Sequence, residues 1–211
     1  GSVLNAVSIV NNVVVAGSIQ AMSRSVTEHG PGALRRGLAL HAALGLLVAG
    51  GLALGSEALG RGVLGDPALP RLLRIAAVVA GNYSVYAALV GALNGRRRFV
   101  AQAGLDMTFA TLRTGLVIGL GATAMGVAGS ITGFAIASAV ITVLALLLVL
   151  RGPAPSDADE PAAVLLARAR SESRGAWAFV RSYLGFFAPV LLYQLALNLV
   201  LQADLLVLKA L

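Results

Sequence analysis

Long runs of apolar residues separated by short polar segments dominate the chain. A membrane-spanning helix needs about 20 mainly apolar residues, because the hydrocarbon core is about 30 Å thick and a helix rises about 1.5 Å per residue. Runs of this kind predict spans at about residues 3–22, 37–55, 72–93, 105–121, 127–150 and 183–208. Run 135–150 does not alternate apolar and polar residues, as a strand of a membrane barrel would. The pattern therefore predicts an all-α integral membrane protein, a polytopic bundle of about six transmembrane helices.

The polar segments divide the chain into three predicted parts. Residues 1–150 hold five spans; the first two are separated by the polar run Ser23–Arg36, with Pro31 and Gly32 as breakers. Residues 151–181 begin as a Pro- and Asp-rich linker and continue as a mixture of arginines and apolar residues. That mixture favours an amphipathic helix on the inner leaflet, with a solvated helical connector as the alternative. Residues 182–211 hold the sixth span, which we expect to open a second half that is missing from this sequence.

Composition excludes several classes of protein. The chain is 58% hydrophobic and 12% charged, whereas soluble domains carry roughly a quarter charged residues. It has no cysteine, which excludes disulfides, thiolate metal sites and cysteine nucleophiles. Two histidines alone make no credible metal site. We therefore expect no metal, no cofactor and no enzymatic activity.

The arginines predict the topology. The net charge is +7, but the arginines cluster in loops, which indicates topology and anionic head groups rather than nucleic acid. Loops of one set contain most of them, at Arg24, Arg35, Arg36, Arg96, Arg97, Arg98, Arg151, Arg168, Arg170, Arg174 and Arg181. By the positive-inside rule these loops are cytoplasmic, which places both chain ends outside. The first span begins without an initiator Met or flanking charge, so we expect a piece of a longer protein; a cloning scar at Gly1-Ser2 is the alternative.

Polar residues inside the spans are candidates for a cavity, because they are costly in lipid and usually face a bundle interior. In the first span they recur, together with the small residue Ala16, at steps of three or four, at Asn5, Ser8, Asn12, Gln20 and Ser23. The sixth span repeats this spacing with Gln194, Asn198, Gln202 and Lys209, while Asp204 lies on another face. Both stripes predict cavity walls, with helix–helix packing as the alternative. Asp204 and Lys209 are equally candidates for ion binding or helix pairing.

Arg113 is the most specific single residue, because it lies in the middle of the fourth span, too far from either end to snorkel easily. Its guanidinium stays charged and suits phosphate, so we expect it to hold an anionic substrate; an interhelical ion pair is the alternative. Asn82, Tyr83 and Tyr86 of the third span are weaker cavity candidates. His41 is expected to be a buried hydrogen-bonding residue, with a proton relay or helix pairing as alternatives. The pairs Gly115/Gly119 and Gly129/Gly133 have the small-xxx-small spacing of closely packed helices.

Three stretches resemble one family of transporters. Residues 82–121 carry Leu89, Gly91, Leu93, Gly95, Arg98 and Phe99 at the end of a span, with Arg113 in the next. Gly126-Val127-Ala128-Gly129 precedes the fifth span, and Gln202-Ala203-Asp204-Leu205 lies near the end of the sixth. This order resembles the polysaccharide-biosynthesis flippases of the multidrug/oligosaccharidyl-lipid/polysaccharide superfamily. The resemblance covers nearly the whole chain, although each motif is loose.

The resemblance implies that the six spans are helices two to seven of a larger transporter in a bacterial cytoplasmic (inner) membrane, monomeric when full length. It implies alternating access that translocates an anionic lipid-linked oligosaccharide or polysaccharide precursor through a cationic cavity, with membrane lipid as the other partner. A cation-coupled multidrug exporter of the same superfamily is an alternative, which predicts acidic residues in the cavity. A membrane-embedded glycosyl- or phosphotransferase needs a carboxylate constellation that the loops lack. A structural membrane subunit is the remaining alternative.

Overall fold

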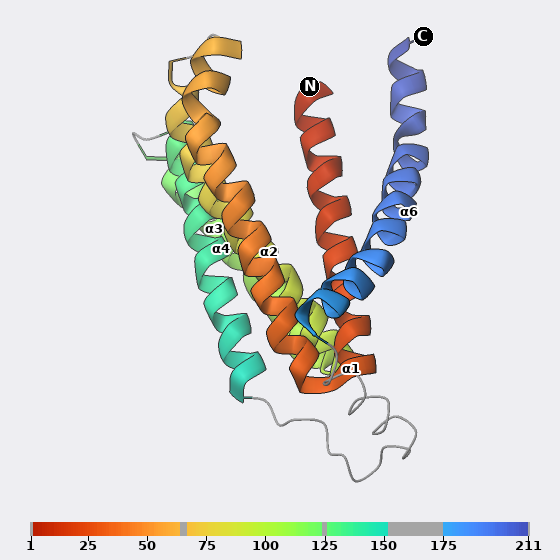
Figure 1. Cartoon of the computed structure of the whole chain (residues 1–211). Helices are drawn as coiled ribbons and strands as arrows, with labels where there is room; N and C mark the ends of the chain where they lie inside the picture. Colours follow the sequence, from red (N-terminus) through yellow and green to blue (C-terminus); the bar gives the residue numbers. More distant parts are fainter. Residues whose placement is uncertain (1, 64–66, 124–125, 152–174, 211) are drawn as a thin grey trace, which may run out of the picture.

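A computed structural model of the whole chain describes residues 2–63, 67–123, 126–151 and 175–210, with side chains except at 2–14, 30, 31, 63, 176 and 198–210. These residues form a helical bundle without strands (Figure 1). In chain order the elements are α1 (Ser2–Glu57), the π-helix η1 (Ala58–Val63), α2 (Leu69–Gly95), α3 (Phe99–Gly121), α4 (Gly126–Arg151) and α6 (Ala176–Ala210). The all-α prediction is confirmed. The predicted interfacial helix falls mainly on residues 152–174, outside the described residues.

Helix α1 differs from the predicted pair of spans, because helical geometry continues through the polar run Ser23–Arg36. The helix nevertheless turns back on itself, as Figure 1 shows. A Cβ added at Gly37 would lie 2.9 Å from Cε of Met22, although fifteen residues of straight helix would separate the two positions by about 22 Å. Pro31 separates α1 into a first arm, residues 2–30, and a second arm, residues 32–57. It has no backbone N–H to donate and so favours a sharp bend. The breakers therefore reverse the chain without ending the helix.

Helix α2 packs along both arms of α1, and this is the most extensive contact in the bundle. Its first half lies on the second arm, where a Cβ at Gly45 would be 3.0 Å from Cβ of Ser84. Its last half lies on the first arm, where a Cβ at Gly91 would be 2.6 Å from the Ile19 carbonyl oxygen. Nearly every residue of the last turns of α2, from Tyr86 to Leu93, is buried. Helix α2 is therefore the centre of the bundle.

Helices α3 and α4 form a second closely packed pair, and α4 also packs on α2. A Cβ at Gly133 of α4 would lie 2.6 Å from the carbonyl carbon of Leu116 in α3. Helix α6 packs on the first arm of α1, where Leu191 and Phe187 approach Gly17. In Figure 1 the first arm of α1 and helix α6 diverge from the other helices toward the ends marked N and C. The bundle is thus splayed at one end and closed at the other.

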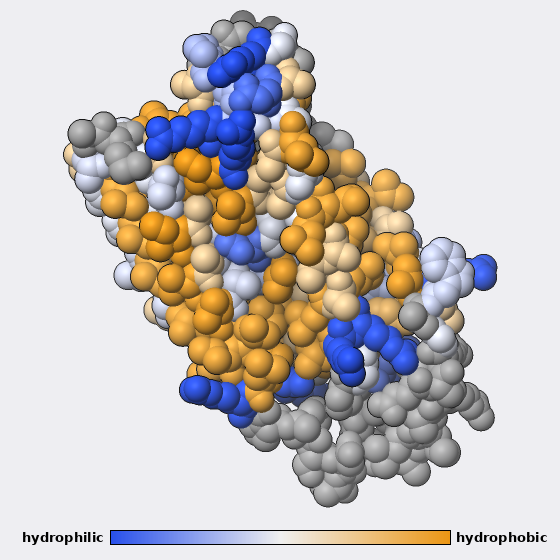
Figure 2. Space-filling view, turned by 60° about the vertical axis from the view of Figure 1, so that its left-hand side comes forward, coloured by the Kyte–Doolittle hydropathy of each residue, from blue (hydrophilic) through white to orange (hydrophobic). Residues whose placement is uncertain are grey.

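Four helical segments are long and apolar enough to cross a membrane: Gly32–Gly62, Leu69–Gly95, Gly126–Arg151 and Trp177–Leu197. They cover the second, third and fifth predicted spans and the first part of the sixth. Helix α3 and the first arm of α1 are not among them. That these two segments cross a membrane therefore stays a prediction. On the face shown in Figure 2, hydrophobic residues cover the middle of the molecule and the strongly hydrophilic residues gather mainly toward its ends. This distribution supports a membrane protein.

Candidate functional site

Arg113 lies in the middle of α3, exposed on the surface of the bundle. Its guanidinium carbon lies 5.7 Å from the ring centroid of Phe109 and 6.0 Å from that of Phe134, which is cation–π distance. The guanidinium also interacts with the hydroxyl of Tyr83. Within the described ranges Arg113 forms no ion pair with a carboxylate. Its positive charge is therefore held by aromatic rings and left uncompensated by the described carboxylates.

The rings below Arg113 form a cluster that joins three helices. It contains Tyr83 and Tyr86 of α2, Phe109 of α3 and Phe134 of α4, and we call it the aromatic cluster. The Tyr83 ring meets the Phe109 and Phe134 rings edge-on, at centroid distances of 5.7 and 5.8 Å. Edge-to-face pairs are the preferred arrangement of aromatic rings. The cluster therefore fixes the part of α3 from which Arg113 extends.

Asp106 is a polar residue of α3 that the sequence analysis did not predict as a site residue. The Tyr86 hydroxyl donates to its Oδ1 at 3.1 Å, and Gln102 Nε2 donates to its Oδ2 at 3.4 Å. Asp106 lies seven residues before Arg113, which places both on the same face of α3 about 10 Å apart along the helix. This seven-residue spacing is visible in the sequence and could have identified Asp106 as a residue on the face of Arg113. The structure thus combines one carboxylate and one guanidinium on a single exposed helix face.

Asn82 and His41 form hydrogen bonds between helices. Asn82 Nδ2 of α2 donates to Oγ of Ser138 in α4 at 3.0 Å. His41 is buried in α1, and its Nε2 lies 2.7 Å from the hydroxyl of Tyr183 in α6. The expectation that His41 is a buried hydrogen-bonding residue is confirmed. The cavity role of Asn82 stays a prediction, because its described contact is with a neighbouring helix.

The two polar stripes lie partly outside the described side chains. Gln20 of α1 is exposed, and Gln194 of α6 is half-buried. Ser23 of α1 is also half-buried. The side chains of the remaining candidates lie outside the described part, namely Asn5, Ser8, Asn12, Asn198, Gln202, Asp204 and Lys209. Their backbone is helical, in α1 and α6. Their cavity and ion-binding roles therefore stay predictions.

Two loop arginines cap the end of α4. Arg96 Nη1 donates to the Val149 carbonyl at 2.8 Å, and Arg98 Nη1 donates to the Leu148 carbonyl at 2.7 Å. The last carbonyls of a helix have no partner within the helix, and they carry the negative end of its dipole. Burial and, secondly, the charge of Arg98 lower the pKa of the Arg96 guanidinium, which nevertheless stays protonated. Arginines expected to set topology thus also fix the α2–α3 turn on α4.

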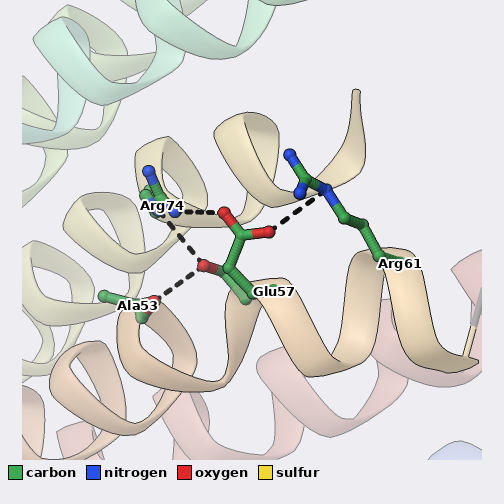
Figure 3. A network of polar contacts seen from close by, with 5 residues as sticks. Ala53, Glu57, Arg61 and Arg74 are labelled. Atoms are coloured by element: carbon green, nitrogen blue, oxygen red, sulfur yellow. Dashed lines mark hydrogen bonds and ion pairs between the residues drawn. The ribbon is translucent and has the colours of Figure 1, made fainter. Parts of the chain in front are cut away.

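The opposite end of the bundle is held by ion pairs around Glu57 (Figure 3). Glu57 Oε1 lies 2.5 Å from Arg74 Nη2, and its Oε2 lies 3.2 Å from Arg61 Nε. Arg74 Nε also donates to Oγ of Ser56 at 3.2 Å. The pairs connect the end of α1 and η1 to the first turns of α2. They are half-exposed, so they position the connection more than they stabilise it.

A cavity of about 270 Å³ lies between α1 and α6. Polar side chains line it at Arg24, Ser25, Glu28, His29, Arg36, Ser182 and Tyr183. Its other side chains include Phe179, Phe186 and Pro189. The Arg24 guanidinium lies 4.4 Å from the centroid of the Phe186 ring. Sequence reasoning missed this cavity, because only the reversal of α1 brings Arg36 beside Arg24.

No group of three or more His, Cys, Asp or Glu side chains that could hold a metal ion occurs among the described residues. A search with this chain finds no matching family model, no matching curated protein and no matching solved structure. The class defined by the fold is therefore a helical bundle whose apolar helices suit a membrane. The resemblance to flippases stays a prediction.

Proposed function

We propose that the chain is part of a membrane transporter that translocates an anionic lipid-linked oligosaccharide or polysaccharide precursor by alternating access. The observation that carries the proposal is the position of Arg113 in the middle of a helix. No described carboxylate forms an ion pair with it, so its positive charge is not compensated by them. Such a charge is costly in lipid and is retained where it faces an aqueous cavity or a bound anion. Its five N–H donors suit a diphosphate.

The aromatic cluster supports the same function. An arginine over aromatic rings is held in place by cation–π attraction, while its outer N–H groups stay available to a ligand. The splayed end of the bundle in Figure 1 suits a protein that opens to one side of a membrane at a time.

Complementation tests the proposal. The gene that encodes this chain would be expressed in a strain that lacks its own flippase for lipid-linked O-units, and surface polysaccharide would be measured. We expect restoration by the wild type, loss with Arg113→Ala, and retention with Arg97→Ala, which removes an exposed loop arginine. Restoration by a well-inserted Arg113→Ala variant would remove Arg113 from the mechanism. A well-inserted wild type that restores nothing would argue against this substrate class.

Asp106 favours a second candidate function, a cation-coupled exporter. A carboxylate in a helix of the bundle is the group that binds a proton or sodium ion in such transporters, and the Tyr86 hydroxyl holds Asp106 in place. Drug efflux from cells that express the gene tests this alternative. Efflux that requires Asp106 but not Arg113 would favour the exporter. Restoration of surface polysaccharide that requires Arg113, without drug efflux, would favour the flippase.

A further inference from the structure

The cavity between α1 and α6 follows one face of each helix. Its α1 wall contains Ala21, Arg24, Ser25 and Glu28, at helical spacing. Its α6 wall runs from Ala178 to Pro189, about 16 Å along the helix. The cavity is therefore elongated along the helix axes, parallel to the direction in which a lipid chain would lie if the bundle crosses a membrane.

The two ends of the cavity differ in polarity. Near the bend of α1 and the start of α6, it is lined by Glu28, His29 and Ser182, together with Ala178 and Phe179. Farther into the bundle, it is lined by Ala21, Phe186 and Pro189. Arg24 lies between the two ends, with its guanidinium over the Phe186 ring. A molecule with an anionic head and an apolar chain would match this order of side chains.

The cavity has an excess of positive charge. Arg24 and Arg36 line it with one carboxylate, Glu28, whose Oε1 lies 2.6 Å from Nε of Arg24. His29 Nδ1 is buried without a hydrogen-bond partner among the described residues. The volume of about 270 Å³ suits a head group and is far too small for an oligosaccharide.

We propose that this cavity binds the phosphate group of an anionic lipid. The guanidinium groups of Arg24 and Arg36 bind the phosphate oxygens, and the hydrocarbon chain runs past Phe186 toward Pro189. Arginine binds phosphate through paired N–H donors, and positively charged loops of membrane proteins commonly face anionic head groups. The bound lipid would join α6 to the bend of α1, two segments that are far apart in the sequence. The proposal does not depend on what the protein transports.

The single tryptophan makes the proposal measurable. Trp177 is exposed at the start of α6, next to Ala178 of the cavity wall. Energy transfer from Trp177 to dansyl-labelled phosphatidylglycerol would be compared with transfer to dansyl-labelled phosphatidylcholine, using the full chain in phosphatidylcholine nanodiscs. We expect a preference for phosphatidylglycerol, and we expect the double variant Arg24→Gln/Arg36→Gln to weaken its binding at least about tenfold.

A matched control separates a site from general attraction between charges. Arg35→Gln/Arg181→Gln removes two exposed arginines from the same two helices without touching the cavity, and it should change binding less than twofold. Equal loss in both double variants, or no preference in the wild type, would overturn the proposal. Glu28→Gln removes the competing carboxylate and should strengthen binding. Unchanged binding by this variant would count against the site even if the arginine variant fails to fold.

Inorganic pyrophosphate distinguishes the source of the phosphate. At constant ionic strength it should displace the labelled lipid only weakly, because the apolar half of the cavity would contribute nothing to its binding. Displacement at the same concentration as a short-chain phosphatidylglycerol would show that the hydrocarbon chain is not recognised. That result would overturn a lipid as the natural ligand.

Discussion

Close packing of α3 against α4 depends on Gly133, and its replacement by alanine gives a prediction with a definite sign. A Cβ at Gly133 would lie 2.6 Å from the carbonyl carbon and 3.1 Å from the amide nitrogen of neighbouring residues in α3. These are backbone atoms of a helix, so they cannot rotate away as a side chain would. Overpacking of this kind costs about 1–3 kcal/mol. Alanine recovers about 0.5–1 kcal/mol of helix propensity. From the middle of each range the net loss should be about 1 kcal/mol, or roughly fivefold in the ratio of folded to unfolded protein.

Gly115 provides the control, because it lies in α3 with open space where its Cβ would be. Gly115→Ala should therefore leave stability unchanged or raise it by up to about 1 kcal/mol. Both variants would be unfolded with increasing sodium dodecyl sulfate in mixed micelles and followed by far-UV circular dichroism. The midpoint should fall for Gly133→Ala alone. Equal midpoints for wild type and Gly133→Ala, or equal losses in both variants, would refute the packing argument.

The same unfolding titration tests three further substitutions, with Tyr193→Phe as the control for the third. Arg98→Ala removes a charged donor to a carbonyl at the end of α4, so it should destabilise the bundle by about 1–3 kcal/mol; no loss would show that the cap is unimportant. Arg97 has a φ of 56°, so Arg97→Gly should stabilise the α2–α3 turn by about 1 kcal/mol, and a loss would contradict the strain. Tyr183→Phe removes the hydrogen bond to His41 and should cost about 1 kcal/mol. Tyr193→Phe at an exposed position should cost nothing measurable.

Most helix positions could be predicted from the sequence, because apolar runs long enough to cross a membrane are visible without tertiary structure. The predicted spans 72–93, 105–121 and 127–150 differ from α2, α3 and α4 by at most three residues at each end, apart from the start of α3. That helix begins at Phe99, six residues earlier than predicted. Arg113 lies in α3, within the predicted fourth span, and Tyr83 was also a candidate, but the neighbouring rings of Phe109 and Phe134 were not predicted.

The sequence by itself determined the class of fold and the uneven distribution of arginine, since both follow from composition along the chain. Only the tertiary structure decided which polar residues meet. Arg24 and Arg36 share a cavity because α1 reverses, and Asp106 is held by Tyr86 because α2 packs beside α3. Gly133 is closely packed and Gly115 is open, although both have the same motif spacing. Spacing along one helix determines which residues share a face, whereas the neighbour of that face depends on how the helices pack against one another.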